Sequence, residues 1–107
     1  MNKLRISPEA VRDLAAIKSY ITYDLQNPIA ARSVISRITK TMRILQEHAM
    51  AGVSVKEKTG YQTDLRMLVC GNYLMLYRVD DSDTVSIARV INSRQDYITQ
   101  LFGEDIF

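Results

Sequence analysis

Arginines are the residues of this 107-residue chain best suited to chemistry with an anion. Residues 61–107 contain four of them as their only basic residues: Arg66, Arg78, Arg89 and Arg94. A planar guanidinium donates two hydrogen bonds at once to a phosphate or carboxylate, so all four are candidates for binding a charged partner. The alternative is that each arginine pairs with a nearby carboxylate and only stabilises the rim of a sheet. The carboxylates considered are Asp64, Asp80, Asp83 and Asp96.

Lysines and tyrosines extend this candidate binding surface. Lys56 and Lys58 lie in a polar stretch that could lean over a sheet and contact a polyanion, unless they are simply solvated. Tyrosine rings can stack on bases, and this part of the chain has Tyr61, Tyr73, Tyr77 and Tyr97. Tyr73 and Tyr77 belong to strand-like runs, where a tyrosine is more often part of the core.

Several familiar kinds of site are disfavoured by the composition. His48 and Cys70 are the single histidine and the single cysteine, whereas a zinc site takes three or four such ligands. The four glycines do not have the spacing of a nucleotide-binding loop. We therefore expect no metal and no cofactor. One cysteine, no secretory signal and no apolar run of about 18 residues favour a cytoplasmic protein outside any membrane.

The charge is divided unevenly along the chain. Residues 1–60 contain ten basic and five acidic residues, giving +5, and residues 61–107 contain four and seven, giving −3, which sum to the net +2. A basic half often faces nucleic acid or an acidic protein, although a solvated helix surface would look the same. Four of the basic residues follow one another in a predicted helix: Arg32, Arg37, Lys40 and Arg43.

Hydrophobic patterning predicts the elements that position these side chains. Residues 2–6 alternate as a strand does. Ser7-Pro8 and Asn27-Pro28 each combine a capping side chain with a proline suited to the first helical position. Each is followed by an apolar stripe at helical spacing, and the short connection predicts an antiparallel helix hairpin. The stripes are Val11, Leu14, Ile17, Ile21 and Leu25, and then Ala31, Val34, Ile35, Ile38, Met42 and Leu45.

The remaining residues predict a sheet. Residues 52–60 lack periodicity and predict a loop, and Gly71-Asn72 is a two-residue hairpin signal. Three strand-like runs flank these turns, at residues 63–70, 73–79 and 84–91. Ser93-Arg94-Gln95-Asp96 has capping-box spacing and opens a short helix that ends at Gly103. The order β-α-α-β-β-β-α predicts a single α+β domain, residues 1–107, with the helix hairpin packed on an antiparallel four-stranded sheet.

Motifs along the whole chain are shared with a known family. In the helical half they are Ile6-Ser7-Pro8-Glu9-Ala10 with Asp13-Leu14 and Ile17, Tyr20-Ile21, and Asp24-Leu25-x-Asn27-Pro28-x-Ala30-Ala31. In the other half they are Arg66, Gly71-Asn72-Tyr73, Tyr77-Arg78-Val79-Asp80, Ile87-x-Arg89-Val90, Arg94-Gln95-Asp96-Tyr97 and Leu101-Phe102. With these motifs the chain resembles the RelE/ParE superfamily, the toxins of bacterial type II toxin–antitoxin modules.

The resemblance implies one of two activities. RelE-like toxins cut messenger RNA on the ribosome, and one of their catalytic arginines follows the tyrosine that begins the third strand. The equivalent residue here is Leu74, after Tyr73, and leucine cannot stabilise the charge of a phosphorane. The late tyrosine of the RelE pattern falls near Gln100, which cannot act as a base, while Arg94 does match. A ribonuclease would then depend on Arg66, Arg78 and Arg94.

ParE-like toxins instead bind DNA gyrase without catalysis of their own, and the chain resembles this branch more closely. Some ParE-like toxins have an apolar residue at the Leu74 position, and the Arg-x-Asp motif followed by Leu101-Phe102 looks more like this branch. The resemblance implies a cognate antitoxin, for which the basic helix face of Arg32, Arg37, Lys40 and Arg43 is the expected contact. It leaves open a homodimer, and a degenerate toxin that only binds its antitoxin.

Overall fold

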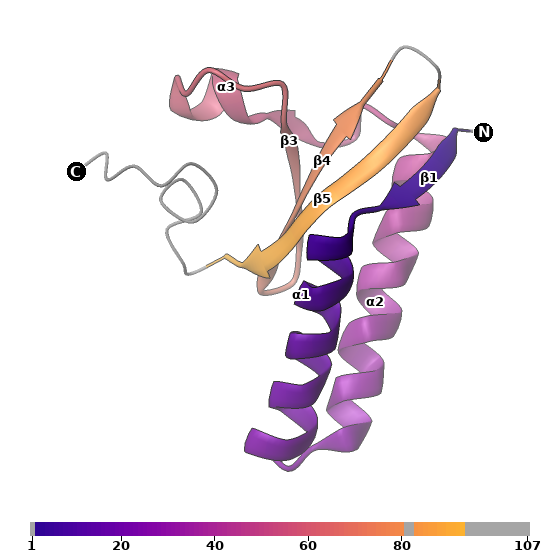
Figure 1. Cartoon of the computed structure of the whole chain (residues 1–107), viewed down its shortest axis with the longest axis vertical. Coiled ribbons are helices and arrows are strands. Elements are labelled where there is room, and N and C mark those ends of the chain that lie inside the picture. Colours follow the sequence, from indigo (N-terminus) through magenta and orange to yellow (C-terminus); the bar gives the residue numbers. More distant parts are fainter. Residues whose placement is uncertain (1, 81–82, 94–107) are drawn as a thin grey trace.

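The protein consists of a helix hairpin packed against a twisted sheet (Figure 1). The computed structural model describes residues 2–80 and 83–93. Its elements, in chain order, are β1 (Lys3–Ile6), α1 (Pro8–Ser19), the single π-helical turn η1 (Tyr20–Asp24), α2 (Pro28–Glu47), β2 (Val53–Ser54), α3 (Val55–Thr59), β3 (Arg66–Cys70), β4 (Tyr73–Val79) and β5 (Thr84–Asn92). The α+β class and the hairpin on the sheet are as predicted, and the predicted helix after Ser93 lies outside the described residues.

Both long helices begin as the sequence predicts. Ser7 caps α1, its Oγ accepting a hydrogen bond from the Ala10 amide at 3.0 Å, and Asn27 caps α2 in the same way through the Ala30 amide. Each capping residue is followed by proline. Proline lacks a main-chain N–H, and at the first position of a helix that N–H would have no partner within the helix. Ser7 also donates a hydrogen bond to the Ala88 carbonyl at 2.7 Å, so the start of α1 is fixed to β5.

The sheet differs from the prediction in strand number and direction. Within residues 2–80 and 83–93 it has five strands in the order β1-β5-β4-β3-β2, and β1 runs parallel to β5 while the other pairs are antiparallel. The predicted sheet of four antiparallel strands is therefore wrong in these two details. The partner of β1 is about 80 residues away along the chain, with Leu4 opposite Val85. Local patterning cannot specify the direction of such a pairing.

The segment expected to be a loop, residues 52–60, contains two short elements. Val53 and Ser54 pair with β3, and α3 follows, capped by the Ser54 hydroxyl. Gly52 lies so close to the sheet that a Cβ atom there would be 2.5 Å from the Met67 carbonyl oxygen. Tertiary contacts with β3 and β4 therefore order this segment, since its own sequence has no period.

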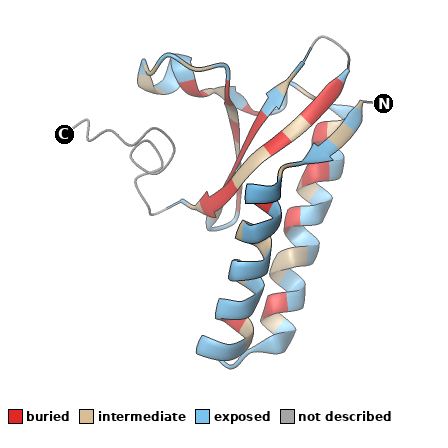
Figure 2. Ribbon diagram, viewed as in Figure 1, coloured by how far each residue is buried: buried red, intermediate tan, exposed pale blue. Residues whose placement is uncertain are grey.

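Two clusters of hydrophobic residues pack on the two faces of the sheet. Figure 2 shows buried positions on the strands of the sheet and on α2. The cluster under the helices includes Ile38, Met42, Met75 and Tyr77, and the cluster on the other face joins Val55 of α3 to Leu65, Met67, Leu74 and Leu76. The second helical stripe is at least partly buried throughout, as predicted. In the first stripe, Val11 and Leu25 are exposed and Ala10 is buried instead, because α1 presents a slightly rotated face to the core.

None of the described helices is long and apolar enough to cross a membrane.

Candidate functional site

Arg66 of β3 holds the segment between α2 and β2. Its guanidinium donates a 2.6 Å hydrogen bond to the Gly52 carbonyl, and its Nε is buried without a partner among the described residues. Tyr77, directly opposite Arg66 in the sheet, donates from its hydroxyl to the Ala49 carbonyl at 2.8 Å and accepts from the Gly52 amide at 2.9 Å. Arg66 therefore faces the helices and fixes the main chain that leaves α2.

Arg78 lies on the opposite face of the sheet from Arg66. Neighbouring residues of a strand point to opposite faces, so Arg78 faces away from Tyr77 and hence from Arg66, which is paired with Tyr77. Arg78 Nε forms a 2.7 Å ion pair with Asp64, one of the carboxylates expected from the sequence, and both side chains are substantially exposed. The sheet therefore separates these two arginines.

Arg89 of β5 is bound to α1 by a two-pronged ion pair. Its Nε and Nη2 donate to the two carboxylate oxygens of Asp13 at 2.7 and 2.9 Å, and the Val90 amide donates to the same carboxylate at 3.0 Å. Hydrogen bonding to Asp13 raises the pKa of Arg89 despite its partial burial. Asp13 is not among the carboxylates that the sequence predicts as partners of the arginines. The feature of the sequence that could have indicated this ion pair is an aspartate next to the apolar stripe of α1.

A depression of about 420 Å³ lies between α1 and the end of β5, next to this ion pair. Its wall combines Asp13 and Arg89 with apolar residues, including Ile17 and Val90, and with Tyr20 and Tyr73. Burial, together with the nearby Tyr20, raises the pKa of the Tyr73 hydroxyl, so this phenol stays a neutral donor around neutral pH. The depression therefore places the Tyr73 hydroxyl, a hydrogen-bond donor, beside the ion pair of Asp13 and Arg89.

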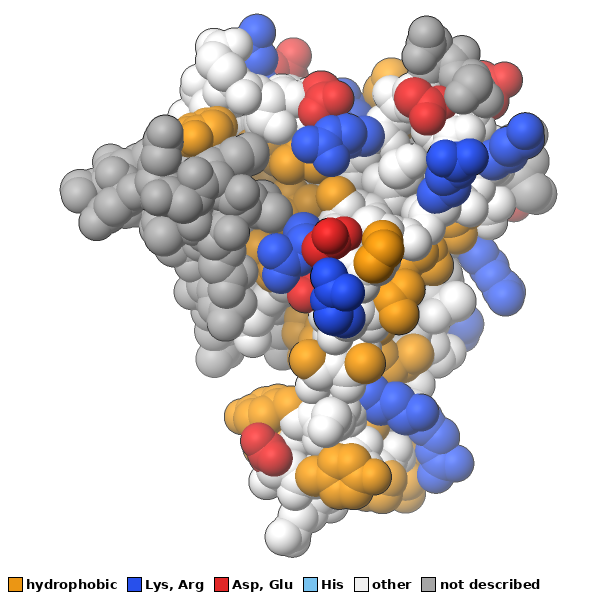
Figure 3. All heavy atoms as spheres, viewed as in Figure 1, with side chains coloured by type: hydrophobic (Ala, Val, Ile, Leu, Met, Phe, Trp, Pro, Cys, Tyr) orange, Lys and Arg blue, Asp and Glu red, His pale blue; other side chains and the backbone are white. Residues whose placement is uncertain are grey.

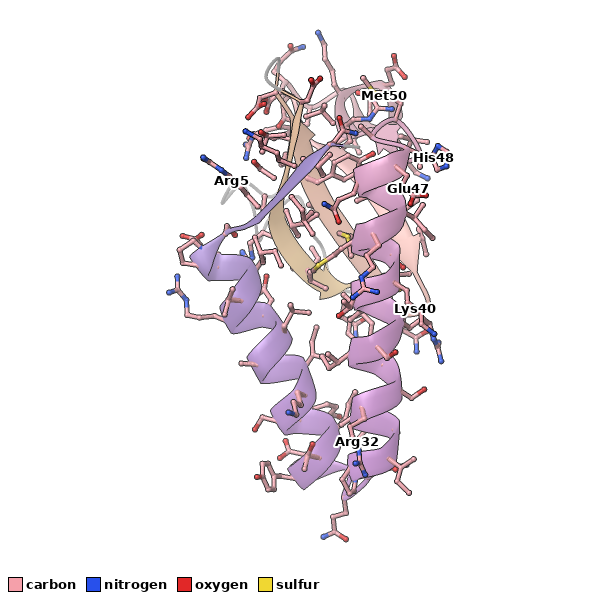
Figure 4. The ribbon with its side chains drawn as sticks, turned by 90° about the vertical axis from the view of Figure 1, so that its right-hand side faces the viewer. Arg5, Arg32, Lys40, Glu47, His48 and Met50 are labelled. Atoms are coloured by element: carbon pink, nitrogen blue, oxygen red, sulfur yellow. The ribbon has the colours of Figure 1, made fainter. Side chains whose placement is uncertain are left out.

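The basic residues of α2 form one outward surface, which we call the basic face: Arg32, Arg37, Lys40 and Arg43, all exposed. The buried residues of α2, such as Ile38 and Met42, lie on the other side of the helix against the sheet. Figure 4 shows Arg32 and Lys40 projecting from α2, and Figure 3 shows basic side chains along the border of the hairpin. The basic face is therefore exposed in the part of the chain that the structure describes.

The hairpin tip exposes apolar side chains (Figure 3). They are Tyr20, Tyr23, Leu25 and Ile29, each more than half exposed.

The remaining sequence candidates are dispersed. Lys56 and Lys58 are exposed on α3, on the other side of the sheet from the helix hairpin. Leu74 is 4% exposed and belongs to a hydrophobic cluster of the sheet. Cys70 is buried and accepts a hydrogen bond from Thr41, while Arg94 and Tyr97 lie outside the described residues. In residues 2–80 and 83–93, no cluster of His, Cys, Asp and Glu could hold a metal ion.

Comparisons with known proteins agree with this fold. The chain superposes on a structure described as the chromosomal ParDE toxin–antitoxin system of P. aeruginosa with a TM-score of 0.71 and 22% identity, covering 86% of this chain and 96% of the other. A structure of the toxin–antitoxin complex RelBE2 from Mycobacterium tuberculosis gives a TM-score of 0.63 and 21% identity, covering 85% and 96%. No curated protein matches the sequence.

Residues 4–97 match the family model described as the ParE toxin of the type II toxin–antitoxin system parDE. The match spans most of the 107 residues. It includes all the described strands in full, apart from β1, whose first residue, Lys3, precedes the match. The chain therefore belongs to the ParE toxin family of type II toxin–antitoxin systems.

Proposed function

We propose that this protein inhibits bacterial growth by binding DNA gyrase, and that a cognate antitoxin neutralises it through the basic face of α2. It would act in the cytoplasm, where both partners are present. Membership of the ParE toxin family supports the toxin role. The choice of gyrase over messenger RNA rests on the placement of the arginines.

The observation that carries this choice is that Arg66 and Arg78 extend from opposite faces of the sheet. Cleavage of RNA requires positive groups that converge on one scissile phosphate. Here Arg66 is bound to Gly52, Arg78 to Asp64 and Arg89 to Asp13, so the arginines of β3, β4 and β5 each already have an internal partner. Leu74, buried in the core, adds no charge.

The antitoxin contact is proposed from charge and exposure. Antitoxin segments that fold on binding can wrap a large surface, and cations spaced along α2 suit an acidic segment. Arg32, Arg37, Lys40 and Arg43 are exposed and have no ion pair among the described residues. An acidic segment could therefore bind them without first breaking internal pairs.

Two assays with one purified preparation test the target. We expect the protein to inhibit supercoiling by gyrase and to leave messages on translating ribosomes intact. Adding the antitoxin encoded by the neighbouring reading frame should restore supercoiling, which controls for contaminating nucleases and inhibitors.

The opposite pattern would overturn the proposal. Message cleavage that disappears in Arg94→Ala, together with normal supercoiling in the presence of the protein, would assign it to the ribonuclease branch. Inactivity in both assays, with tight antitoxin binding, would identify a degenerate toxin.

A further inference from the structure

We propose that the basic face of α2 binds the phosphate backbone of duplex DNA. This inference rests on the proposed function, because gyrase would hold the DNA that the protein meets. Phosphates are a second kind of ligand for this face, besides the acidic antitoxin. The residue types on the face, their freedom from internal ion pairs and the length of the face all support such a ligand.

The exposed side chains of α2 between residues 32 and 43 are all either cations or carry a hydroxyl. They are Arg32, Ser33, Ser36, Arg37, Thr39, Lys40 and Arg43. The apolar residues of this range are buried or partly buried, among them Ile38 and Met42 against the sheet. Arg, Lys, Ser and Thr side chains are among the groups that form hydrogen bonds to the phosphates of DNA. The exposed surface of this part of α2 therefore consists of residue types that bind phosphate.

The four cations of the basic face are not neutralised by carboxylates of the same chain. None of them has an ion pair within residues 2–80 and 83–93. The single acidic residue of α2 is Glu47, and it comes after the last of these cations. Three of the four are arginines, whose planar guanidinium can donate two hydrogen bonds to one phosphate. In contrast to Arg78 and Arg89, which are bound to aspartates, the basic face therefore keeps its charge for a ligand.

The basic face is long enough to contact several phosphates at once. From Arg32 to Arg43 an α-helix rises by about 16 Å. Duplex DNA carries one phosphate charge for about every 1.7 Å of its axis, so all four cations can be placed beside the backbone of one duplex. Figure 4 shows Arg32 and Lys40 projecting from α2, with no other element in front of them in this view.

The composition of the basic face favours a nucleic acid over a protein as the ligand that uses all of it. Protein interfaces generally have a core of aromatic and apolar side chains inside a polar rim. The exposed apolar side chains Tyr20, Tyr23 and Leu25 lie at the hairpin tip, outside residues 32–43. An acidic antitoxin segment could still bind the basic face through charge, and it would then exclude DNA from this face.

The salt dependence of DNA binding tests the proposal. Fluorescence anisotropy with a short labelled DNA duplex and the purified protein alone gives the association constant. Four neutralised phosphates predict a slope of about −3.6 for its logarithm against the logarithm of salt concentration, which is roughly 100-fold weaker binding at 200 mM than at 50 mM salt. Arg32→Gln/Lys40→Gln removes two of the contacts and should make the slope shallower by about 2. The matched control, Lys56→Gln/Lys58→Gln, makes the same charge change on α3, on the other side of the sheet, and should keep the original slope.

A second variant covers the case in which Arg32→Gln/Lys40→Gln does not fold. Arg37→Gln/Arg43→Gln removes the other two cations of the basic face and should change the slope by the same amount. Circular dichroism would establish folding of each variant. Binding that does not depend on salt, equal slopes for the α2 and α3 variants, or tighter binding of a duplex RNA of the same length would each overturn the proposal.

Supercoiling assays separate this proposal from the proposed function, because DNA binding is measured without gyrase. If the unchanged protein binds DNA with the expected salt slope but does not inhibit supercoiling, the gyrase target is wrong and the DNA contact stands. If it inhibits supercoiling but does not bind DNA by itself, the gyrase target stands and the DNA contact is wrong.

Discussion

At the scale of single residues, the arginines of β3, β4 and β5 act first as structural groups. Arg66, Arg78 and Arg89 each bind a carbonyl or carboxylate of the same chain. Their partners come from three different parts of the fold: Gly52 between α2 and β2, Asp64 before β3 and Asp13 in α1. A guanidinium that is engaged in this way stabilises the protein and has less capacity to bind a ligand.

Asp13→Ala should therefore destabilise the fold strongly for a single substitution. It leaves the partly buried Arg89 guanidinium and the Val90 amide without their shared acceptor. We expect a loss of about 2–4 kcal/mol in the free energy of unfolding, measured by urea denaturation. Glu9→Ala is the control, since Glu9 pairs with Arg12 at 3.7 Å on the exposed side of α1 and should change stability by about 0.5 kcal/mol or less. Equal effects of the two variants would contradict a structural role for Asp13.

Tyr77→Phe tests the attachment of the segment that follows α2. The substitution preserves the buried ring but removes the hydroxyl that bonds Gly52 and Ala49, leaving two main-chain groups unpaired. The expected loss is about 1–3 kcal/mol in the free energy of unfolding. Tyr23→Phe, at a side chain that is 73% exposed, provides the matched control and should leave the unfolding midpoint nearly unchanged.

At the scale of elements, the two faces of α2 have different roles: one packs in the core, and the other is the basic face proposed to bind the antitoxin. Ile38, Met42 and Leu45 are buried against the sheet, whereas the basic face points to solvent. Charges on the basic face can therefore be changed without disturbing the core, which makes α2 suitable for testing the antitoxin contact.

Arg32→Glu/Lys40→Glu should weaken antitoxin binding while leaving the protein folded. Exposed charges across an interface act mainly through association rate and are screened by salt. We expect a slower association at low ionic strength, measured by surface plasmon resonance, and a smaller difference at high salt. Lys56→Glu/Lys58→Glu makes the same charge change on α3, on the other side of the sheet. A similar effect from both double variants would show that net charge, and not the basic face, controls binding.

At the scale of the whole molecule, contacts between distant segments join the chain into one unit. β1 pairs with β5, Ser7 bonds Ala88, and Asp13 bonds Arg89, so the N-terminal elements depend on the last strand. The prediction that residues 1–107 form a single domain is consistent with this interdependence and can be tested by unfolding.

We expect one cooperative unfolding transition for the full chain. Far-ultraviolet circular dichroism, which reports mainly the helices, and tyrosine fluorescence should give the same midpoint in urea. Separate midpoints would show that the helix hairpin and the sheet unfold independently, and the single-domain prediction would then be wrong.

The sequence by itself determined the features that depend on neighbouring residues. Ser7-Pro8 and Asn27-Pro28 each contain the residue that caps the following helix, so the helix starts were predictable. Gly71-Asn72 forms the turn between β3 and β4, so this hairpin was predictable as well. Motifs along the chain were sufficient for the toxin family, and Leu74 distinguished its branches. The outward position of Arg32, Arg37, Lys40 and Arg43 followed from the apolar stripe opposite them.

Only the tertiary structure decided which distant groups meet. The parallel pairing of β1 with β5, the ion pair of Arg89 with Asp13 and the order in residues 52–60 all depend on partners elsewhere in the chain. These contacts are stabilised by burial and by hydrogen bonds that form only when the chain is compact. The periodicity of the local sequence therefore does not predict them. The sequence could name Arg66 and Arg78 as candidates, but the pairing of Arg66 with Tyr77 placed the two on opposite faces of the sheet.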